Sequence, residues 1–517
     1  MQIGVPVESD INEHRVAATP KTIKRFKDLG FEVLVQSGAG KKAGFKDEEY
    51  TARGATVVDG LSTLHEKSDI VIRVQPPTKE EAAKYRKGQL GIGFSEADRN
   101  EETLQIIADQ GASYIAMDGI PRISRAQKMD ALSSMANVSG YRAVIEGATQ
   151  YGKFLNGQMT AAGKVDPAKV LVIGAGVAGL AAMATAKNMG AVVKAFDTRK
   201  STEDQIRSLG AEVLTVDIQE DGSTAAGYSK VMSQAFIDAE MALFRSLAPD
   251  IDIVICTALV PMRPAPKLWL EDMVEKMKPG SVVVDLAYPR GGNCDLTVPG
   301  EVVKSDNGVT IVGVLDQMPK QSSELYSSNI AHLLDDMGGG EDFKIDTDDK
   351  VILGSLIVHD GEVNWPLPQI SVAAPNVPKQ KEEVKVPEVK KSKPVISKKT
   401  KRASTIWSAI IGGALLWLVG AYAPPEFMNH FTVFVLSIFI GWQVIWNVSH
   451  SLHTPLMSVT NAISGIILLG GILHVGTEFD LRTILAVIAV FVASINVVGG
   501  FLVTHKMLRM FHKEKEV

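Results

Sequence analysis

A glycine-rich segment in the middle of the chain has the residue order of a dinucleotide-binding turn. The apolar run VLVI at 170–173 is followed by Gly174, Gly176 and Gly179 in the spacing GxGxxG, and then by an alanine-rich stretch typical of a helix. In a strand–turn–helix unit the first glycine permits the tight turn, the second lets backbone N–H groups approach a pyrophosphate, and the third lets the helix pack on the strand. Because the start of a helix attracts phosphates, the spacing predicts a nucleotide site.

A carboxylate ends the same unit at the position where ribose is recognised. The apolar run AVVKAF leads to Asp197, 18 residues after the third glycine. A carboxylate there accepts hydrogen bonds from the adenosine ribose and repels a 2′-phosphate, which favours NAD over NADP, although Arg199 weakens this preference. Apolar runs at 251–261 and 280–287 predict later strands of the same sheet, which puts Leu259 near the nicotinamide half.

Polar side chains also gather in PRISRAQKMDALSS, residues 121–134, directly after an apolar run. From the residues alone two interpretations remain open. Either the side chains form part of a ligand site, or they mark the start of a helix with Ser124 as its cap and a charged surface face. The polar residues concerned are Arg122, Arg125, Gln127, Asp130 and Ser133.

The first 130 residues alternate apolar runs with helical patterns, as a second α/β domain would. The predicted strands are QIGVPVE, FEVLVQSGAG, DIVIRVQPP and ASYIAMDGI, and no second glycine-rich fingerprint accompanies them. The sequence therefore predicts two Rossmann-like doubly wound α/β domains with one dinucleotide site. We place the first domain at 1–135, completed by 325–375, and the NAD(H)-binding domain at 136–325.

The end of the chain has a different composition. A Lys-rich stretch without apolar periodicity predicts a flexible basic linker at 376–403. Four apolar runs of about 20 residues follow, the length of a membrane-spanning helix. Because Lys and Arg precede the first run and follow the last, both termini are expected to be cytoplasmic. The expected all-α segment, 404–503, has spans at 404–424, 428–448, 456–475 and 482–503, and a basic cytoplasmic tail follows at 504–517.

Several polar side chains interrupt these apolar runs. They either form packing contacts between helices or line a polar seam for an ion or a proton. No acidic or basic side chain lies deep in any run, so a proton carrier would be one of two histidines or would come from another chain. The polar residues are Asn447, His450, His453, Thr460, Asn461, Ser464 and Asn496.

Charge and cysteine content argue against other classes of function. The formal net charge is −5 and no stripe of Lys and Arg with aromatic residues is present, so we expect no nucleic-acid partner. Cys256 and Cys294 form no CxxC and lie near no His cluster, so we expect no metal. The N-terminus has neither a secretory leader nor transit-peptide composition, so the α/β part is expected to stay where it is made.

The chain resembles the alpha subunits of bacterial proton-translocating NAD(P) transhydrogenases over nearly its whole length. The resemblance implies NAD(H) on this chain and hydride transfer between NADH and NADP+, coupled to proton translocation. It also implies a beta subunit that carries NADP(H) and further membrane helices, a dimer of alpha–beta pairs, and the bacterial inner membrane with its lipid bilayer. The segments that carry it are EHRVAATP, PRISRAQKMDALSSMAN, AAGKVDPAKVLVIGAGVAGLAA, FDTR, CTALVPMRPAPKL, HFTVF and HTPLMSVTNAISG.

The same resemblance implies roles for residues of this chain. Arg122, Asp130 and Ser133 orient the nicotinamide of NAD(H), and Gln127 reaches the nucleotide of the neighbouring domain, so Gln127, Arg122 and Asp130 are the implied catalytic residues. Tyr228 lies in a loop that closes over the site. Hydride transfer needs no acid or base, so no catalytic triad is expected. The other implied contacts are Ile123, Ser124, Arg125, Gly174, Gly176, Val177, Gly179, Asp197, Thr198, Arg199, Gly227 and Leu259.

Two alternatives belong to other functional classes. The α/β part is also similar to alanine dehydrogenase, a family that activates its amino acid with a lysine and a histidine. This chain has Gln75 and Phe94 in the corresponding segments and keeps only Arg15, which cannot supply the proton transfer. The second alternative is an NAD-sensing regulatory subunit of an ion pathway, against which only the loop at 121–130 argues.

Overall fold

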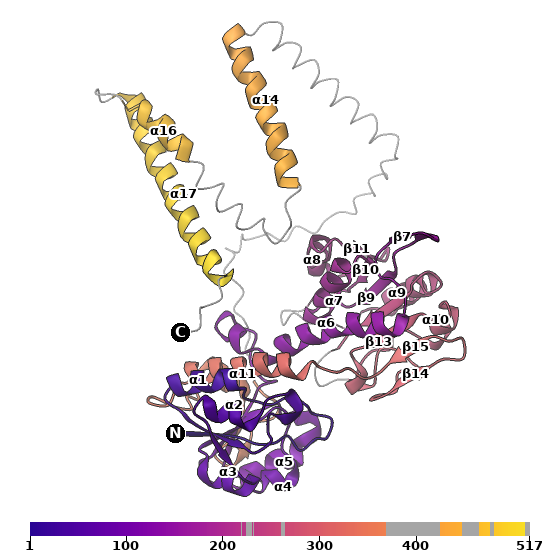
Figure 1. Cartoon of the computed structure of the whole chain (residues 1–517), viewed down its shortest axis with the longest axis vertical. Helices are drawn as coiled ribbons and strands as arrows, with labels where there is room; N and C mark the ends of the chain where they lie inside the picture. The colour runs from indigo at the N-terminus through magenta and orange to yellow at the C-terminus, as the bar shows by residue number, and fades with distance from the viewer. Residues whose placement is uncertain are drawn as a thin grey trace, which may run out of the picture. The chain divides into compact units, whose positions relative to one another are not determined.

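The computed structural model shows two compact units, Met1–Gln380 and Lys381–Val517 (Figure 1). The residues that the structure describes are 1–218, 220–223, 230, 232–259, 264–368, 424–446, 465–475 and 480–511.

The first unit contains an eight-stranded sheet with the order β17-β16-β6-β5-β4-β1-β2-β3. Strands β1 to β6 run parallel, and the antiparallel pair β16 and β17 extends the β6 edge. Successive residues of one strand enter different cores, with Val33 and Val35 on one face and Leu34 on the other. The strands are β1 (Gln2–Val5), β2 (Glu32–Gln36), β3 (Thr56–Val58), β4 (Ile70–Ile72), β5 (Leu90–Gly93), β6 (Ser113–Ala116), β16 (Leu356–His359) and β17 (Glu362–Val363).

A second sheet in the same unit has seven strands in the order β11-β10-β9-β12-β13-β15-β14, and only β14 is antiparallel. Its central strands alternate between two cores in the same way, with Val170 and Val172 on one face and Leu171 and Ile173 on the other. A small hairpin of β7 and β8 stands apart from it. The strands are β7 (Gln158–Thr160), β8 (Gly163–Val165), β9 (Lys169–Ile173), β10 (Val192–Phe196), β11 (Glu212–Val213), β12 (Ile253–Cys256), β13 (Val282–Asp285), β14 (Val302–Lys304) and β15 (Thr310–Val312).

Helices cover the sheets and connect them (Figure 1). Helix α6 leads from the first sheet to the second and packs on α7, and α11 leads back and packs on α1 and α6. These two parallel sheets with crossover helices confirm the predicted pair of Rossmann-like α/β domains. The helices are α1 (Pro20–Asp28), η1 (Lys41–Ala43), α2 (Asp47–Ala52), α3 (Leu61–Lys67), α4 (Lys79–Ala82), α5 (Ala97–Asp109), η2 (Ser124–Met129), α6 (Ala131–Tyr151), α7 (Val177–Asn188), η3 (Lys200–Thr202), α8 (Glu203–Ser208), α9 (Gln234–Leu247), α10 (Glu271–Lys276), η4 (Tyr288–Arg290), α11 (Pro319–Asp336) and α12 (Lys350–Ser355).

The described residues of the second unit lie mainly in helices. Helix α16 packs against α17, and a Cβ atom on Gly471 would lie 2.7 Å from Val490 Cγ2, so glycine allows the close approach. In the part of the chain that the structure describes, no helix combines the length and the apolar character needed to cross a membrane. The helices are α14 (Pro425–Trp446), α16 (Gly465–Leu473) and α17 (Leu481–Phe511).

The sequence predictions for this unit are only partly within the described residues. The expected spans 428–448 and 482–503 overlap α14 and α17, and the end of 456–475 overlaps α16. The linker at 376–403 and, apart from Pro424, the span at 404–424 lie outside the described residues. The same holds for the polar residues between 447 and 464, including both histidines, whereas Asn496 lies in α17.

Candidate functional site

The glycine turn lies between β9 and α7, at the carboxyl edge of the second sheet. Gly174 has a φ of 102°, a conformation that residues with a side chain rarely adopt. A Cβ atom on Gly179 would collide with the carbonyl oxygen of Gly174, whereas a Cβ atom on Gly176 would meet nothing within 4 Å. The turn itself therefore requires the first and third glycines, and the second leaves open space beside the start of α7. This arrangement fits a pyrophosphate held by backbone N–H groups.

Asp197 follows β10 and is anchored to the glycine turn. Its Oδ2 accepts a hydrogen bond of 2.6 Å from the backbone N–H of Ala175. Arg199 donates from Nε to Oδ1 at 2.9 Å and from Nη2 to Oδ2 at 2.8 Å, and this hydrogen bonding raises the pKa of Arg199. The next residue, Thr198, accepts a 2.9 Å hydrogen bond at its carbonyl from Gly222. The carboxylate is thus fixed beside the turn, with its arginine partner next to it.

Residues after β12 form the opposite wall of the turn. Because β9 lies between β10 and β12, the turn is at the switch point of the sheet, where open α/β folds bind ligands. Thr257 donates its hydroxyl to the last carbonyl of β9 at 3.0 Å, and the buried Asn293 binds the N–H and C=O of Ala258 at 3.1 and 2.8 Å. Val177 and Leu259, each 40% exposed, leave apolar surface open at this point.

The polar loop, residues 121–130, leads from the first sheet into α6. Its 3-10 helix η2 packs Ala126 and Met129 into the first core, while Arg122 and Gln127 are exposed. The loop is therefore anchored on its apolar side and presents polar side chains on the other. Ile123 packs against the edge of the same core.

Asp130, rather than Ser124, caps the helix that follows the polar loop. The Asp130 carboxylate accepts hydrogen bonds from the N–H of Ser133 at 2.8 Å and from its hydroxyl at 2.5 Å. Ser124 begins η2 and is exposed, and η2 has no side-chain cap. The interpretation of the loop as a helix start capped by Ser124 is therefore wrong in its detail. Arg125 pairs with Asp349 and Asp336.

Helix α6 holds the polar loop and the glycine turn at a fixed separation. Gly140 lies ten residues after Asp130 and packs against the backbone of Ala178 in α7, where a larger residue would collide with a carbonyl oxygen. Ten residues of α-helix rise about 15 Å. One rigid helix therefore connects the two places where the sequence predicts contacts with a single dinucleotide.

Two polar contacts, here called the interdomain clasp, connect the carboxyl edges of the two sheets. Arg290 in η4, after β13, forms a bidentate ion pair with Asp98 in α5, after β5, in which Nη2 and Oδ1 are 3.1 Å apart. Arg99 also donates to the carbonyl of Pro289 at 3.0 Å. The hydrogen bond from Arg290 lowers the pKa of Asp98. The two α/β domains are thus joined at the carboxyl edges of their sheets.

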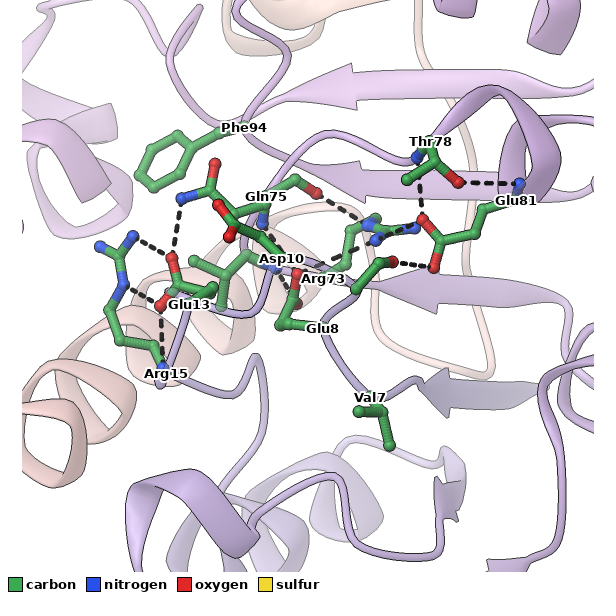
Figure 2. A network of polar contacts seen from close by, with 12 residues as sticks. Val7, Glu8, Asp10, Glu13, Arg15, Arg73, Gln75, Thr78, Glu81 and Phe94 are labelled. Atoms are coloured by element: carbon green, nitrogen blue, oxygen red, sulfur yellow. Dashed lines mark hydrogen bonds and ion pairs between the residues drawn. The ribbon is translucent and has the colours of Figure 1, made fainter. Parts of the chain in front are cut away.

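Figure 2 shows a network of buried charges at the switch point of the first sheet, between β1 and β4. Arg73, 1% exposed, donates to the Glu81 carboxylate at 3.0 Å and lies 3.8 Å from Glu8, which accepts the N–H of Val74 at 2.6 Å. Burial alone would lower the pKa of Arg73, but the two carboxylates raise it, so Arg73 stays charged. These side chains occupy the place where a ligand would meet the first sheet, and an open hollow of about 410 Å³ remains beside them.

The second half of this network involves the residues that bear on amino-acid chemistry. The Glu13 carboxylate accepts two hydrogen bonds from the guanidinium of Arg15, at 2.6 and 2.8 Å, and one from its backbone N–H at 2.8 Å, and it accepts a fourth, of 2.7 Å, from Gln75. Phe94 packs on the ring of Tyr326 at 5.2 Å between centroids. The arginine is therefore neutralised within the chain, and neither position 75 nor position 94 carries a group that can transfer a proton near neutral pH.

Glu240 is a buried carboxyl whose pKa is affected by the charge of Asp197. It lies on α9 and is 5% exposed. Burial first, and the charge of Asp197 second, raise the pKa of Glu240 to about 7. The Glu240 carboxyl therefore gains or loses its proton within the physiological pH range.

Two of the predicted site residues, Gly227 and Tyr228, lie outside the described residues. Asn293 and the interdomain clasp were not predicted from the sequence, although the segment GGN shortly after the predicted strand at 280–287 was a signal for Asn293. Among the described residues, no group of three or more His, Cys, Asp or Glu side chains is arranged to hold a metal ion.

Three family models match this chain. The N-terminal and C-terminal domains of the alanine dehydrogenase/PNT family match residues 4–139 and 143–366. The 4TM region of pyridine nucleotide transhydrogenase matches residues 430–513. The matches therefore cover both α/β domains and the helical end of the chain.

Individual proteins of the same families are also similar to this chain. The NAD(P) transhydrogenase subunit alpha of Cereibacter sphaeroides is 52% identical over 99% of this chain and the whole of that protein. A solved transhydrogenase structure from Sinorhizobium meliloti has a TM-score of 0.62 at 38% identity and covers 71% of this chain and 99% of its own. A solved L-alanine dehydrogenase has a TM-score of 0.60 at 25% identity and covers 71% of this chain and 97% of its own.

Proposed function

The chain belongs to the family of NAD(P) transhydrogenase alpha subunits, and we propose that it holds NAD(H) at the glycine turn and exchanges a hydride with NADP(H) on a beta subunit. As a member of this family the chain is part of a transhydrogenase that couples hydride transfer to proton translocation. The observation that carries the assignment of NAD(H) is the glycine turn with Asp197 fixed beside it by the 2.6 Å hydrogen bond to Ala175.

The adenosine half of the nucleotide is assigned to the second sheet. Gly174, Gly176 and Gly179 let backbone N–H groups surround the pyrophosphate at the start of α7. Asp197 accepts from the ribose hydroxyls and repels a 2′-phosphate, and Arg199 screens part of that charge because it is paired with the carboxylate. Val177 and Thr198 complete this side as neighbours of the turn and of the carboxylate.

The nicotinamide half is assigned to the polar loop. Arg122, Asp130 and Ser133 orient the ring, Gln127 reaches toward the second nucleotide, and Leu259 supplies apolar surface. Bound nicotinamide nucleotides supply the hydride chemistry itself, so the chain contributes alignment and exclusion of water. The loop that contains Gly227 and Tyr228 is proposed to close over the site. The other residues of the polar loop, Ile123, Ser124 and Arg125, are proposed to shape the nicotinamide site.

A partner is required because the second nucleotide has no comparable turn in the described part of this chain. The name of the relatives, subunit alpha, implies a beta subunit. We assign NADP(H) and further membrane helices to that subunit, with two alpha–beta pairs in the assembly. One charge moving through about 100 mV supplies about 2.3 kcal/mol, enough to shift the ratio of two nearly isoenergetic couples roughly 40-fold.

The helical end is proposed to anchor the chain in the bacterial inner membrane. The match to a 4TM region over 430–513 and the four apolar runs of the sequence support four spans within 404–503. The basic linker at 376–403 and the basic tail at 504–517 support cytoplasmic termini. In this division the NAD(H) domain is 136–325, and 1–135 forms the other domain with 325–375, to which the pairing of β16 with β6 lends support.

Amino-acid dehydrogenation is not supported by the site. The arginine that would hold a substrate carboxylate, Arg15, is bound by Glu13, and Gln75 and Phe94 cannot act as acid or base. We therefore assign a structural role to this part of the first domain, which is similar to that of alanine dehydrogenase.

The assignment is tested with the subunit alone and with its partner. The alpha subunit alone should bind NADH, detected by nucleotide fluorescence, and should bind NADPH much more weakly. Membranes that contain both subunits should reduce an NADP analogue with NADH and move protons. Alanine-dependent reduction of NAD would contradict the proposal, and intact NADH binding without hydride transfer would favour the NAD-sensing alternative.

A further inference from the structure

The polar loop is built around the short 3-10 helix η2. Before and at the ends of this helix, the N–H of Ile123 donates to the carbonyl of Pro121 at 2.9 Å, the N–H of Ala126 donates to the carbonyl of Ile123 at 3.0 Å, and the N–H of Asp130 reaches the carbonyl of Gln127 at 3.4 Å. Short 3-10 segments have poor hydrogen-bond geometry and depend on their surroundings. The buried side chains of Ala126 and Met129 fix the depth of the loop, and contacts with other segments bear on the directions of its exposed side chains.

Those contacts come from the end of the first unit, more than 200 residues later in the sequence. Arg125 places Nη2 at 2.6 and 2.5 Å from the two carboxylate oxygens of Asp349, and its Nη1 lies 3.4 Å from Asp336. At the other end of η2, Asn329 donates its amide to the carbonyl of Lys128 at 2.9 Å. Helix α11 and the start of α12 therefore hold the loop at both of its ends.

Asp349 is itself fixed in place by the backbone. It is the N-cap of α12 and accepts the N–H of Val351 at 2.7 Å. Helix α12 continues into β16, which pairs with β6, the strand that precedes the polar loop. The Asp349 carboxylate is thus held by the backbone at the start of a helix that leads into the first sheet. A carboxylate fixed in this way can position the guanidinium of Arg125 more rigidly than a free surface side chain can.

We propose that Asp349, through Arg125, is a positioning residue for hydride transfer: it sets the direction in which the polar loop presents Gln127 and Arg122. This inference rests on the proposed role of the loop. Arg125 is thereby assigned to the support of the loop instead of to direct contact with a nucleotide. Because a displacement near 1 Å can slow a reaction by about 100-fold, a small rotation of η2 would suffice to impair transfer without unfolding the chain.

The decisive variant is Asp349→Asn. Asparagine caps helices as well as aspartate does, so α12 is retained while the charge opposite Arg125 is lost. In membranes with both subunits, we expect NADH affinity within about twofold of wild type and single-turnover hydride transfer about tenfold slower, since alignment and not binding is changed. The thermal midpoint should be unchanged. Asp349→Glu should recover most of the rate, and the exposed neighbour variant Asp348→Asn should behave as wild type.

A second variant separates positioning from a general structural effect. If Asp349 acts through Arg125, the double variant Arg125→Gln/Asp349→Asn should be no slower than Arg125→Gln alone. Wild-type transfer in Asp349→Asn, or additive losses in the double variant, would overturn the inference. Gln127→Asn distinguishes the two proposals: if it is slow while Asp349→Asn is not, only the positioning role is wrong, and if Gln127→Asn transfers at the wild-type rate, the role of the loop itself is wrong.

Discussion

Arg290 and Asp98 join the two α/β domains through a bidentate ion pair, although 192 positions separate them in the sequence. Both side chains are mostly buried, at 14% and 22% exposed. Each follows a strand at the carboxyl edge of its own sheet. The pair therefore restrains the separation of the two domains at the edge where the nucleotide is proposed to lie.

Loss of this restraint should speed the exchange of nucleotide. We expect Arg290→Gln to raise the NADH dissociation rate about two- to fivefold, the effect of losing an ion pair worth up to about 1 kcal/mol. Stopped-flow displacement of NADH measures the rate. Glu101→Gln is the control. It changes an exposed residue of α5, the helix that contains Asp98, and should leave the NADH dissociation rate unchanged. A slower dissociation of NADH would mean that the interdomain clasp holds the two domains apart.

Asp197 should control the choice between NADH and NADPH. In Asp197→Asn the acceptor for Ala175 can remain, but the charge is lost. We expect NADH affinity to fall about tenfold or more, the worth of a hydrogen bond to a charged group, while NADPH affinity rises because repulsion of its 2′-phosphate disappears.

Fluorescence titration with both nucleotides measures this change in preference. The exposed Asp217→Asn is the matched control and should bind both as wild type does. An equal loss for the two nucleotides would show that Asp197 only supports the glycine turn.

Glu240 should make stability depend on pH. Its pKa, raised to about 7 in the folded chain from the ordinary 4.5, means that the folded state binds a proton that the unfolded state lacks between these values. The stabilisation is fully present below pH 4.5 and is lost as pH rises through 7. The free energy of unfolding should fall by about 3 kcal/mol by pH 8 on this account.

Glu240→Gln removes the titration. Relative to wild type it should be more stable at pH 8 by up to about 3 kcal/mol, and by less than about 1 kcal/mol at pH 5. Denaturant unfolding of the alpha subunit at both pH values measures the difference. Glu275→Gln, at an exposed position on α10, is the control for the removal of a carboxylate. A pH-independent effect of Glu240→Gln would contradict the assignment.

The sequence was most informative where the residues of a feature lie close together along the chain. The strand, the GxGxxG turn, the helix and Asp197 follow one another within about 30 residues, and local spacing determines the geometry of such a unit. The central strands were predicted for the same reason, because buried parallel strands are continuous apolar runs. These are β1, β2, β4 and β6 in the first sheet and β9, β10, β12 and β13 in the second, whereas β3, β5, β11 and the strands that extend the sheet edges were not predicted.

Contacts between distant segments were not predictable from one sequence. Nothing in the pattern around Arg125 distinguishes a guanidinium that meets a nucleotide from one that meets Asp349, and nothing around Asp98 indicates Arg290. These pairs depend on the packing of two domains and on the return of the chain through α11. The cap of α6 was also misjudged, because Ser124 and Asp130 are both good caps and only the structure shows where the helix begins.

The most direct test of the account is Gln127→Asn in membranes that contain both subunits. The variant shortens the side chain by one methylene while it keeps the amide. We predict NADH affinity within about twofold of wild type and hydride transfer to an NADP analogue about tenfold slower, because alignment is lost while binding contacts remain. A large loss of NADH affinity with an unchanged single-turnover rate would contradict the claim that the polar loop aligns the nucleotides.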